Sequence, residues 1–116
     1  MSKTQIWHNP RCSKSRQTLA LLEAEGIKAE VILYKDNAPS AADIRAVLAA
    51  LNMGPRGLIR QKDAAFVALE LATDAADEAL IAAMVEHPEI IERPVVRHAE
   101  MAALGRPPES VLKLFG

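Results

Sequence analysis

The feature that most constrains the fold is the order of patterns in the first 34 residues: a strand, a turn, a helix and a second strand. Residues 4–7 are rich in strand formers, and the chain turns at Asn9-Pro10 because proline disfavours helical geometry in the residue before it. Residues 14–26 favour a helix that stops at a glycine, and residues 29–34 favour a strand. Such a unit has a right-handed connection and parallel strands, which predicts the α/β class.

The middle of the chain has a different pattern, rich in alanine and typical of helices. Ser40 is a predicted N-cap with Asp43 three residues later, the region of Thr73 opens another helix, and Pro88 stops it. The three predicted helices cover residues 40–52, 57–69 and 74–87. A strand pair and a short closing helix are then predicted at residues 95–98, at 101–104 and from Pro107 onwards. The predicted order is β-α-β, a helical insertion over about residues 40–90, and β-β-α.

Length and composition exclude several classes of protein. A chain of 116 residues has the length of one domain, so residues 1–116 are predicted to form a single domain. Fourteen basic and fifteen acidic residues give a net charge of -1, which argues against nucleic acid or an anionic membrane as the main partner. The absence of an export signal or a long apolar run predicts a cytoplasmic protein. One cysteine and three scattered histidines predict no metal site, and the lack of a nucleotide-binding motif predicts no bound cofactor.

The residues with chemical potential concentrate in HNPRCSKSR, residues 8–16, where the one cysteine lies between the first strand and the first helix. A thiol at this position faces free backbone N–H groups, the positive end of a helix dipole and the cations of Arg11, Lys14 and Arg16, all of which favour the thiolate. The same amides favour binding of an oxyanion. A lone cysteine is often an inert buried residue, but polar and basic neighbours indicate that Cys12 is a nucleophile.

The neighbours of the cysteine leave alternatives open. His8 either satisfies a backbone carbonyl or tunes the thiol, and Ser15 either caps the helix or donates to the thiolate. A cysteine phosphatase would need arginine where Thr18 stands, and the sequence has no phosphate-binding loop of the GxxxxGK[ST] type. The sequence therefore argues against phosphatase and nucleotide-hydrolase functions.

Four separated motifs, HNPRCSKSR, LIRQKD, ERPVV and GRPPE, resemble in order and spacing the glutaredoxin-coupled arsenate reductase family over essentially the whole chain. The resemblance implies an α/β fold with a thioredoxin-like mixed sheet and a helical insertion. It also implies that Cys12 attacks arsenate, while the oxyanion is held by Arg60, Arg93 and Arg106. Arginine suits this role because its planar guanidinium forms bidentate, charge-assisted hydrogen bonds to an oxyanion. His8, Ser15 and Arg16 are the predicted thiolate-tuning residues.

Each arginine also has an ordinary alternative. Arg60 could pair with Asp63 three residues later, Arg93 could pair with its neighbour Glu92, and the third arginine could be a solvated turn residue. By similarity to the thioredoxin pattern, Pro94 would follow a cis peptide bond. The sequence departs from the family at Asp63, where a longer glutamate is common, and over residues 96–101, which lack the usual glycine of the hairpin turn.

Electron counting defines the partners. Reduction of arsenate to arsenite needs two electrons, whereas this chain has one thiol and no cofactor motif, so external thiols must complete the reaction. The family implies glutathione as co-substrate and glutaredoxin as the partner that recycles the mixed disulfide. Two other functions stay open: an Spx-like regulator that binds RNA polymerase, although Ser15 removes the Cys-x-x-Cys switch typical of that group, and a glutaredoxin-like thiol transferase acting on another substrate. Similar proteins also include uncharacterised housekeeping members, so another oxyanion is an open alternative.

Overall fold

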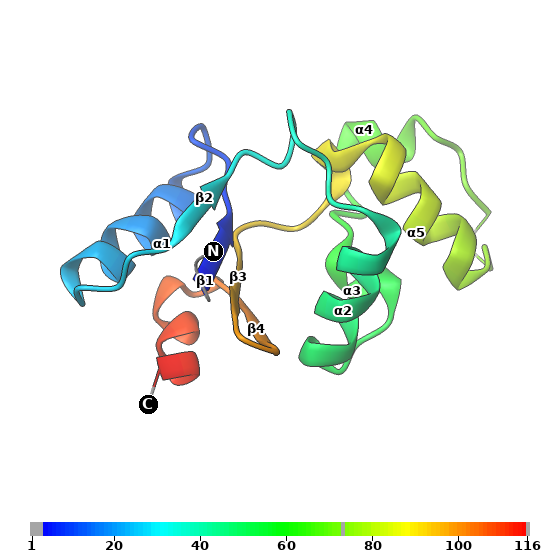
Figure 1. Ribbon diagram of the computed structural model, residues 1–116. Helices are drawn as coiled ribbons and strands as arrows, with labels where there is room; N and C mark the ends of the chain where they lie inside the picture. Colours follow the sequence, from blue (N-terminus) through cyan, green and yellow to red (C-terminus); the bar gives the residue numbers. More distant parts are fainter. Residues whose placement is uncertain (1–3, 73, 116) are drawn as a thin grey trace.

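The computed structural model describes residues 4–72 and 74–115. Figure 1 shows a sheet with one helix and the C-terminal segment on one side and the helices of the insertion on the other. Within the described residues the sheet has four strands in the order β2-β1-β3-β4, where β1 is parallel to β2 and antiparallel to β3, and β3 is antiparallel to β4. The strands are β1 Thr4–Trp7, β2 Glu30–Ile32, β3 Val95–His98 and β4 Met101–Leu104. The predicted α/β order is confirmed.

The helices begin and end where local sequence signals place them. Gly26, with φ of 74°, ends the first helix, and the N–H of Ile27 returns to the carbonyl of Leu22 at 2.9 Å. Ser40 and Asp43 cap the second helix reciprocally, as predicted. The helices are α1 Ser13–Ala24, α2 Ala41–Leu51, α3 Pro55–Leu58, α4 Ala64–Val67 and α5 Asp77–Glu86, with the 3-10 helices η1 Pro88–Ile90 and η2 Pro108–Phe115.

The predicted helix over residues 57–69 is wrong, and the break in it has a functional consequence. The chain forms two short helices, α3 and α4, separated by an extended Ile59 that pairs with Ile91 as an isolated antiparallel bridge. Hydrogen bonds on both sides of this bridge connect the N–H of Arg60 to the carbonyl of Ile90 at 2.8 Å, and the N–H of Glu92 to the carbonyl of Leu58 at 2.6 Å. The bridge buries Ile59 and Ile91 completely or nearly so, which outweighs helix propensity here, and it places Arg60 beside the chain before β3.

Three other boundaries differ from prediction. The strand predicted at 29–34 ends at Ile32 because the carbonyl of Leu33 accepts from two following amides and turns the chain. The helix predicted at 74–87 begins at Asp77, where acidic residues occupy its first turn; Thr73, its predicted opening, lies outside the described residues. The closing helix is a 3-10 helix. The strand pair is confirmed, and its turn uses Ala99 with φ of 54° in place of a glycine.

The sheet divides the core into two parts, because successive strand residues point to opposite faces. On one face Ile6, Val96 and Ala103 pack with buried residues of α1 and η2. On the other face Trp7 and Val95 belong to the larger cluster formed with the helical insertion. The sheet is therefore covered on both sides. At the end of the sheet where β1 and β2 finish, the loops that follow the strands can form a site.

Four chain segments meet at that end of the sheet. Trp7 at the end of β1 lies opposite Ile32 at the end of β2 and opposite Val95 at the start of β3. Val95 in turn lies opposite Leu104 at the end of β4. The segments that follow β1, β2 and β4, and the one that precedes β3, consequently converge. The N–H of Gly105 donates to the carbonyl of the residue before Val95 at 2.9 Å, which fastens two of these segments together.

Candidate active site

Cys12 lies in the loop after β1, here called the thiol loop, residues 8–16. It is the N-cap of α1 with an extended backbone, and its own N–H donates to the carbonyl of Asn9 at 3.0 Å. Its carbonyl accepts the first helical bond, from the N–H of Arg16 at 3.0 Å. The thiol is therefore fixed at the amino end of α1, where the N–H groups of the first turn have no helical partner.

The surroundings of the thiol favour its ionised form. Burial is the largest single influence and opposes ionisation, but it is outweighed by the N–H of Ser15, by both a hydrogen bond and the charge of Arg93, and by the N–H of Lys14. The pKa of Cys12 is consequently lower than the usual value of a thiol. The protein thus holds a thiol that is ionised at lower pH than a free cysteine.

The side chains of the predicted tuning residues His8 and Ser15 bond to each other. The Oγ of buried Ser15 accepts from the N–H of Asn9 at 3.0 Å and shares a 2.7 Å hydrogen bond with Nδ1 of His8. Of the two alternatives for Ser15, capping of the helix is wrong, because Cys12 is the N-cap; Ser15 reaches the thiol through its backbone N–H. Burial first, and then the charge of Arg16, lower the pKa of His8. His8 is neutral near pH 7 and supplies no positive charge to the thiolate.

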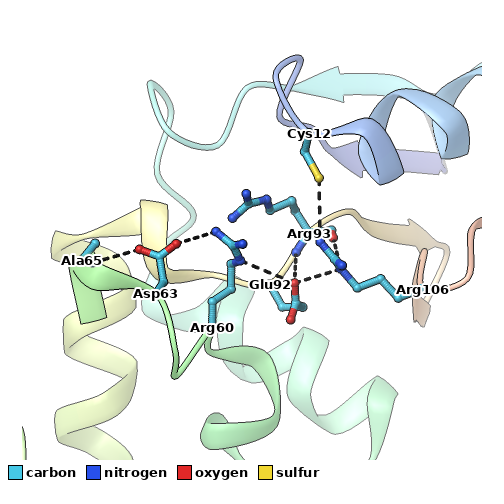
Figure 2. A network of polar contacts seen from close by, with 7 residues as sticks. All are labelled: Cys12, Arg60, Asp63, Ala65, Glu92, Arg93 and Arg106. Atoms are coloured by element: carbon cyan, nitrogen blue, oxygen red, sulfur yellow. Dashed lines mark hydrogen bonds and ion pairs between the residues drawn. The ribbon is translucent and has the colours of Figure 1, made fainter. Parts of the chain in front are cut away.

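The arginine cluster consists of Arg60, Arg93 and Arg106, whose side chains point into the space below the thiol (Figure 2). Arg93 and Arg106 come from two of the converging segments, before β3 and after β4, and Arg60 comes from the segment between α3 and α4. Nη2 of Arg106 lies 3.8 Å from Sγ of Cys12, and its Nε donates to the carbonyl of Arg93 at 2.8 Å. Because Arg93 also bonds to the thiol, two of the three predicted arginines contact Cys12. The peptide bond between Arg93 and Pro94 is cis, as the thioredoxin pattern implied.

Two carboxylates hold the cluster. Glu92 is shared: its Oε1 lies 3.0 Å from Nε of Arg106 and 3.9 Å from Nε of Arg60, and it accepts from the N–H of Arg93 at 3.3 Å. Asp63 pairs with Arg60 at 2.6 Å, so the ordinary alternative for Arg60 is realised within the site itself. Three positive and two negative groups leave the cluster one net positive charge, which the ionised thiol balances. Sequence reasoning treated Glu92 only as the chain neighbour of Arg93 and missed that it contacts all three arginines.

Two buried polar atoms of the described residues have no hydrogen-bond partner: Nε of Arg93 and the hydroxyl of Tyr34. Arg93 belongs to the site, and Tyr34 is a fully buried residue just beyond β2. Tyr34 was not predicted as a site residue, because in the sequence it is one more strand former in AEVILY. A buried tyrosine hydroxyl normally has a hydrogen-bond partner. The missing partner, which only the structure reveals, marks Tyr34 as a candidate site residue.

A hollow of about 480 Å³ opens beside the arginine cluster and is large enough for a tetrahedral oxyanion and part of a second reactant. It is lined by Ile59, Arg60, Gln61, Lys62, Asp63, Glu92 and Arg106.

In the described part of the chain, no three of the histidine, cysteine and acidic residues come close enough to bind a metal ion together. None of the helices over residues 4–72 and 74–115 has the length and apolar character needed to cross a membrane.

The fold and the site together define a thioredoxin-like protein with an activated thiol at the start of its first helix. The model of the ArsC family matches residues 7–114, and the chain belongs to this family. A protein of Escherichia coli strain K12 named uncharacterized protein YfgD is 47% identical over 116 residues, with 98% of both chains covered. An arsenate reductase of Neisseria meningitidis is 42% identical over 113 residues, with 96% of this chain and 97% of the relative covered.

Solved structures show the same relationship. A structure described as arsenate reductase from Vibrio cholerae superposes with a TM-score of 0.92 at 44% identity and covers 97% of each chain. The match extends over the sheet, α1 and the insertion alike, because it includes nearly the whole chain. The thioredoxin-like fold that the resemblance implied is thereby confirmed.

Proposed function

We propose that this protein is an arsenate reductase in which the Cys12 thiolate forms a covalent adduct with arsenate and external thiols complete the reduction. The observation that carries the proposal is the meeting of an activated thiol with guanidinium groups brought from three separate segments. Relatives named arsenate reductase at about 40% identity support it. Helix amides and arginines together form the environment that a tetrahedral oxyanion requires.

In the first step the thiolate of Cys12 attacks arsenic. A sulfur–arsenic bond forms, and one arsenate oxygen leaves as water after taking up protons from solvent. Arg93 and Arg106, which already contact the thiol, are placed to hold the remaining oxygens and to stabilise the negative charge that develops on them. The arginine cluster therefore serves both binding and charge stabilisation.

In the second step two electrons pass from thiols to arsenic. Glutathione attacks the adduct, arsenic goes from the pentavalent to the trivalent state, and Cys12 and glutathione end as a mixed disulfide. Glutaredoxin then removes the glutathione by thiol–disulfide exchange and regenerates Cys12. The single cysteine of the chain supports this sequence, because the second thiol must come from another molecule.

The test is the consumption of NADPH in a mixture of arsenate, glutathione, glutaredoxin and glutathione reductase. We expect arsenate-dependent turnover in the wild type, none in Cys12→Ser, and a severe reduction in Arg93→Ala. Arg45→Ala is the matched control, since Arg45 pairs with Glu78 on an exposed helix surface and should leave turnover unchanged.

The contrary result has a definite meaning. If the folded wild type alkylates rapidly at Cys12 but shows no arsenate-dependent turnover, the reductase proposal is wrong. Protection of Cys12 from alkylation by other oxyanions would then identify a different substrate, and lack of any protection would favour a thiol transferase. The relative named only as an uncharacterized protein makes this control essential, because its name assigns no substrate.

A further inference from the structure

The hydroxyl of Tyr34 is a buried polar group without a partner in the described part of the chain. The side chain is fully buried, and its ring packs in the larger core cluster with Trp7 and Val95. Leaving such a hydroxyl unpaired lowers stability, because the group gives up its hydrogen bonds to water and gains none in return. Phenylalanine would fill the same space without that penalty, so packing does not explain the hydroxyl.

The topology places the segment that carries Tyr34 beside the thiol loop. The N–H of His8 donates to the carbonyl of Ile32 at 2.9 Å, so the chain after β2 leaves the sheet beside the thiol loop. A surface hollow is lined on one side by the loop and on the other by Leu33 and Lys35. Tyr34 stands between these two exposed residues and is itself buried, so its side chain points away from solvent and into the molecule.

Electrostatics connect the same hydroxyl to the catalytic groups. Burial raises the pKa of Tyr34 and is the largest influence on it; the charge of Cys12 acts in the same direction as burial. The charges of Arg93 and Arg60 act in the opposite direction, as does a hydrogen-bond interaction with the side chain of Asn9, which places the hydroxyl next to the thiol loop. The phenol is therefore protonated at pH 7 and is a donor. Nε of Arg93 is the other unpartnered buried donor of this region.

We propose that Tyr34 is a further oxyanion-binding residue, whose hydroxyl donates to one oxygen of the tetrahedral oxyanion at the inner end of the site, together with the unpartnered Nε of Arg93. This inference rests on the proposed function, since it deepens the description of the same site. A neutral donor adds selectivity, because it requires an oxygen that can accept a hydrogen bond at that position and adds no further positive charge. Without the oxyanion neither donor has an acceptor within hydrogen-bond distance, and with it both are satisfied.

The proposal predicts effects of opposite sign for Tyr34→Phe. Removal of an unpartnered hydroxyl should leave the midpoint of thermal unfolding unchanged or raised, whereas the loss of a donor to the oxyanion should weaken oxyanion binding about tenfold. Thr4→Val is the matched control. It also removes a buried hydroxyl, but one that is bonded to Nδ1 of His98 at 2.8 Å, at the opposite end of β1 from the thiol loop. The control should lower thermal stability and leave oxyanion binding unchanged.

The experiment measures the rate of Cys12 alkylation by iodoacetamide at increasing concentrations of sodium arsenate, and separately of sodium sulfate, for the wild type and both variants. We expect arsenate to protect the wild type, and about tenfold more arsenate to be needed for Tyr34→Phe. Equal protection of wild type and Tyr34→Phe, or a fall in thermal stability equal to that of Thr4→Val, would overturn the Tyr34 inference alone. Protection of the wild type by sulfate but not by arsenate would overturn the proposed substrate, and the tenfold shift would then be sought with sulfate.

Discussion

The thiol loop and the arginine cluster contribute to one site but are built in different ways. The loop is contiguous in sequence, and the bonds within it join residues at most seven positions apart, such as His8 and Ser15. Its N–H at His8 also donates to the carbonyl of Ile32 at the end of β2. The cluster is assembled across the fold: Arg106 reaches the sulfur of Cys12 from a position 94 residues away. The loop acts on the thiol largely through backbone N–H groups, whereas the cluster acts through side-chain charges that carboxylates hold in place.

This difference separates two functions of the site. The loop favours ionisation of the thiol, because its N–H groups and the positive end of α1 stabilise a negative charge. The cluster determines what the thiol meets, because its charges and its shape depend on distant segments that the sheet brings together. Arg93 contributes to both functions, since it lowers the pKa of the thiol and is part of the cluster. Substitutions should therefore divide into those that change ionisation, those that change oxyanion binding, and those at Arg93 that change both.

The largest expected effect is that of Arg93→Ala. We expect kcat/KM for arsenate to fall about 100- to 1000-fold, since the partner of an ionised, partly buried group is removed. The pKa of Cys12 is lowered in part by Arg93, so the variant should need higher pH to form the thiolate, and the pH profile of iodoacetamide alkylation should move upward. Arg106→Ala should also impair turnover but leave that profile nearly unchanged; an equal upward move in both variants would contradict the distinction.

The next effect concerns the internal bonds of the loop. In Ser15→Ala the buried N–H of Asn9 and the ring of His8 lose their shared partner. We expect the free energy of unfolding in urea to fall by about 1–3 kcal/mol. The alkylation profile should hardly move, because Ser15 acts on the thiol through its N–H, which alanine retains. A large upward move of the profile with unchanged stability would show that the hydroxyl, not the backbone, activates Cys12.

A smaller effect is expected when the shared carboxylate of the cluster loses its charge. In Glu92→Gln an oxygen still accepts from the arginines, but the positive charge facing the oxyanion increases. The KM for arsenate should fall about 3- to 10-fold at low ionic strength, and the gain should shrink with added salt. Glu78→Gln is the control, since the ion pair of Glu78 with Arg45 is far more exposed to solvent than the pairs of Glu92. A rise in KM for Glu92→Gln would mean that its charge is needed to position the arginines.

The smallest effect should follow Arg16→Ala. Without the positive charge of Arg16 the pKa of His8 should rise toward its usual 6.5, although burial still lowers it. An NMR titration of the imidazole ring measures this change. In the wild type the unfolded chain binds a proton on His8 more readily than the folded chain. Stability therefore rises with pH up to about 6.5, and the variant should show a weaker rise. Alkylation of Cys12 at pH 7 should change less than about twofold, whereas a large change would link Arg16 directly to the thiol.

Sequence reasoning succeeded where local patterns determine the structure. The β-α-β unit, the capping of α2 by Ser40 and the strand pair after Pro94 all follow from residues that are neighbours in the chain. It failed at Arg60, which was placed inside a helix, because the bridge between Ile59 and Ile91 depends on a contact between distant segments. Glu92 and Tyr34 were missed for the same reason, since the partners of one and the lack of partners of the other exist only in the folded chain.

The separation of Cys12 and Arg106 along the chain also has a consequence during synthesis. At a typical rate of about 5–20 residues per second, the 94 additions that lead from Cys12 to Arg106 take about 5 to 20 s. A growing chain that has reached only α2 already contains the cysteine, but it lacks every arginine of the cluster. The newly made thiol is thus present for seconds before the groups that select its reaction partner, and the finished active site is a property of the completed chain.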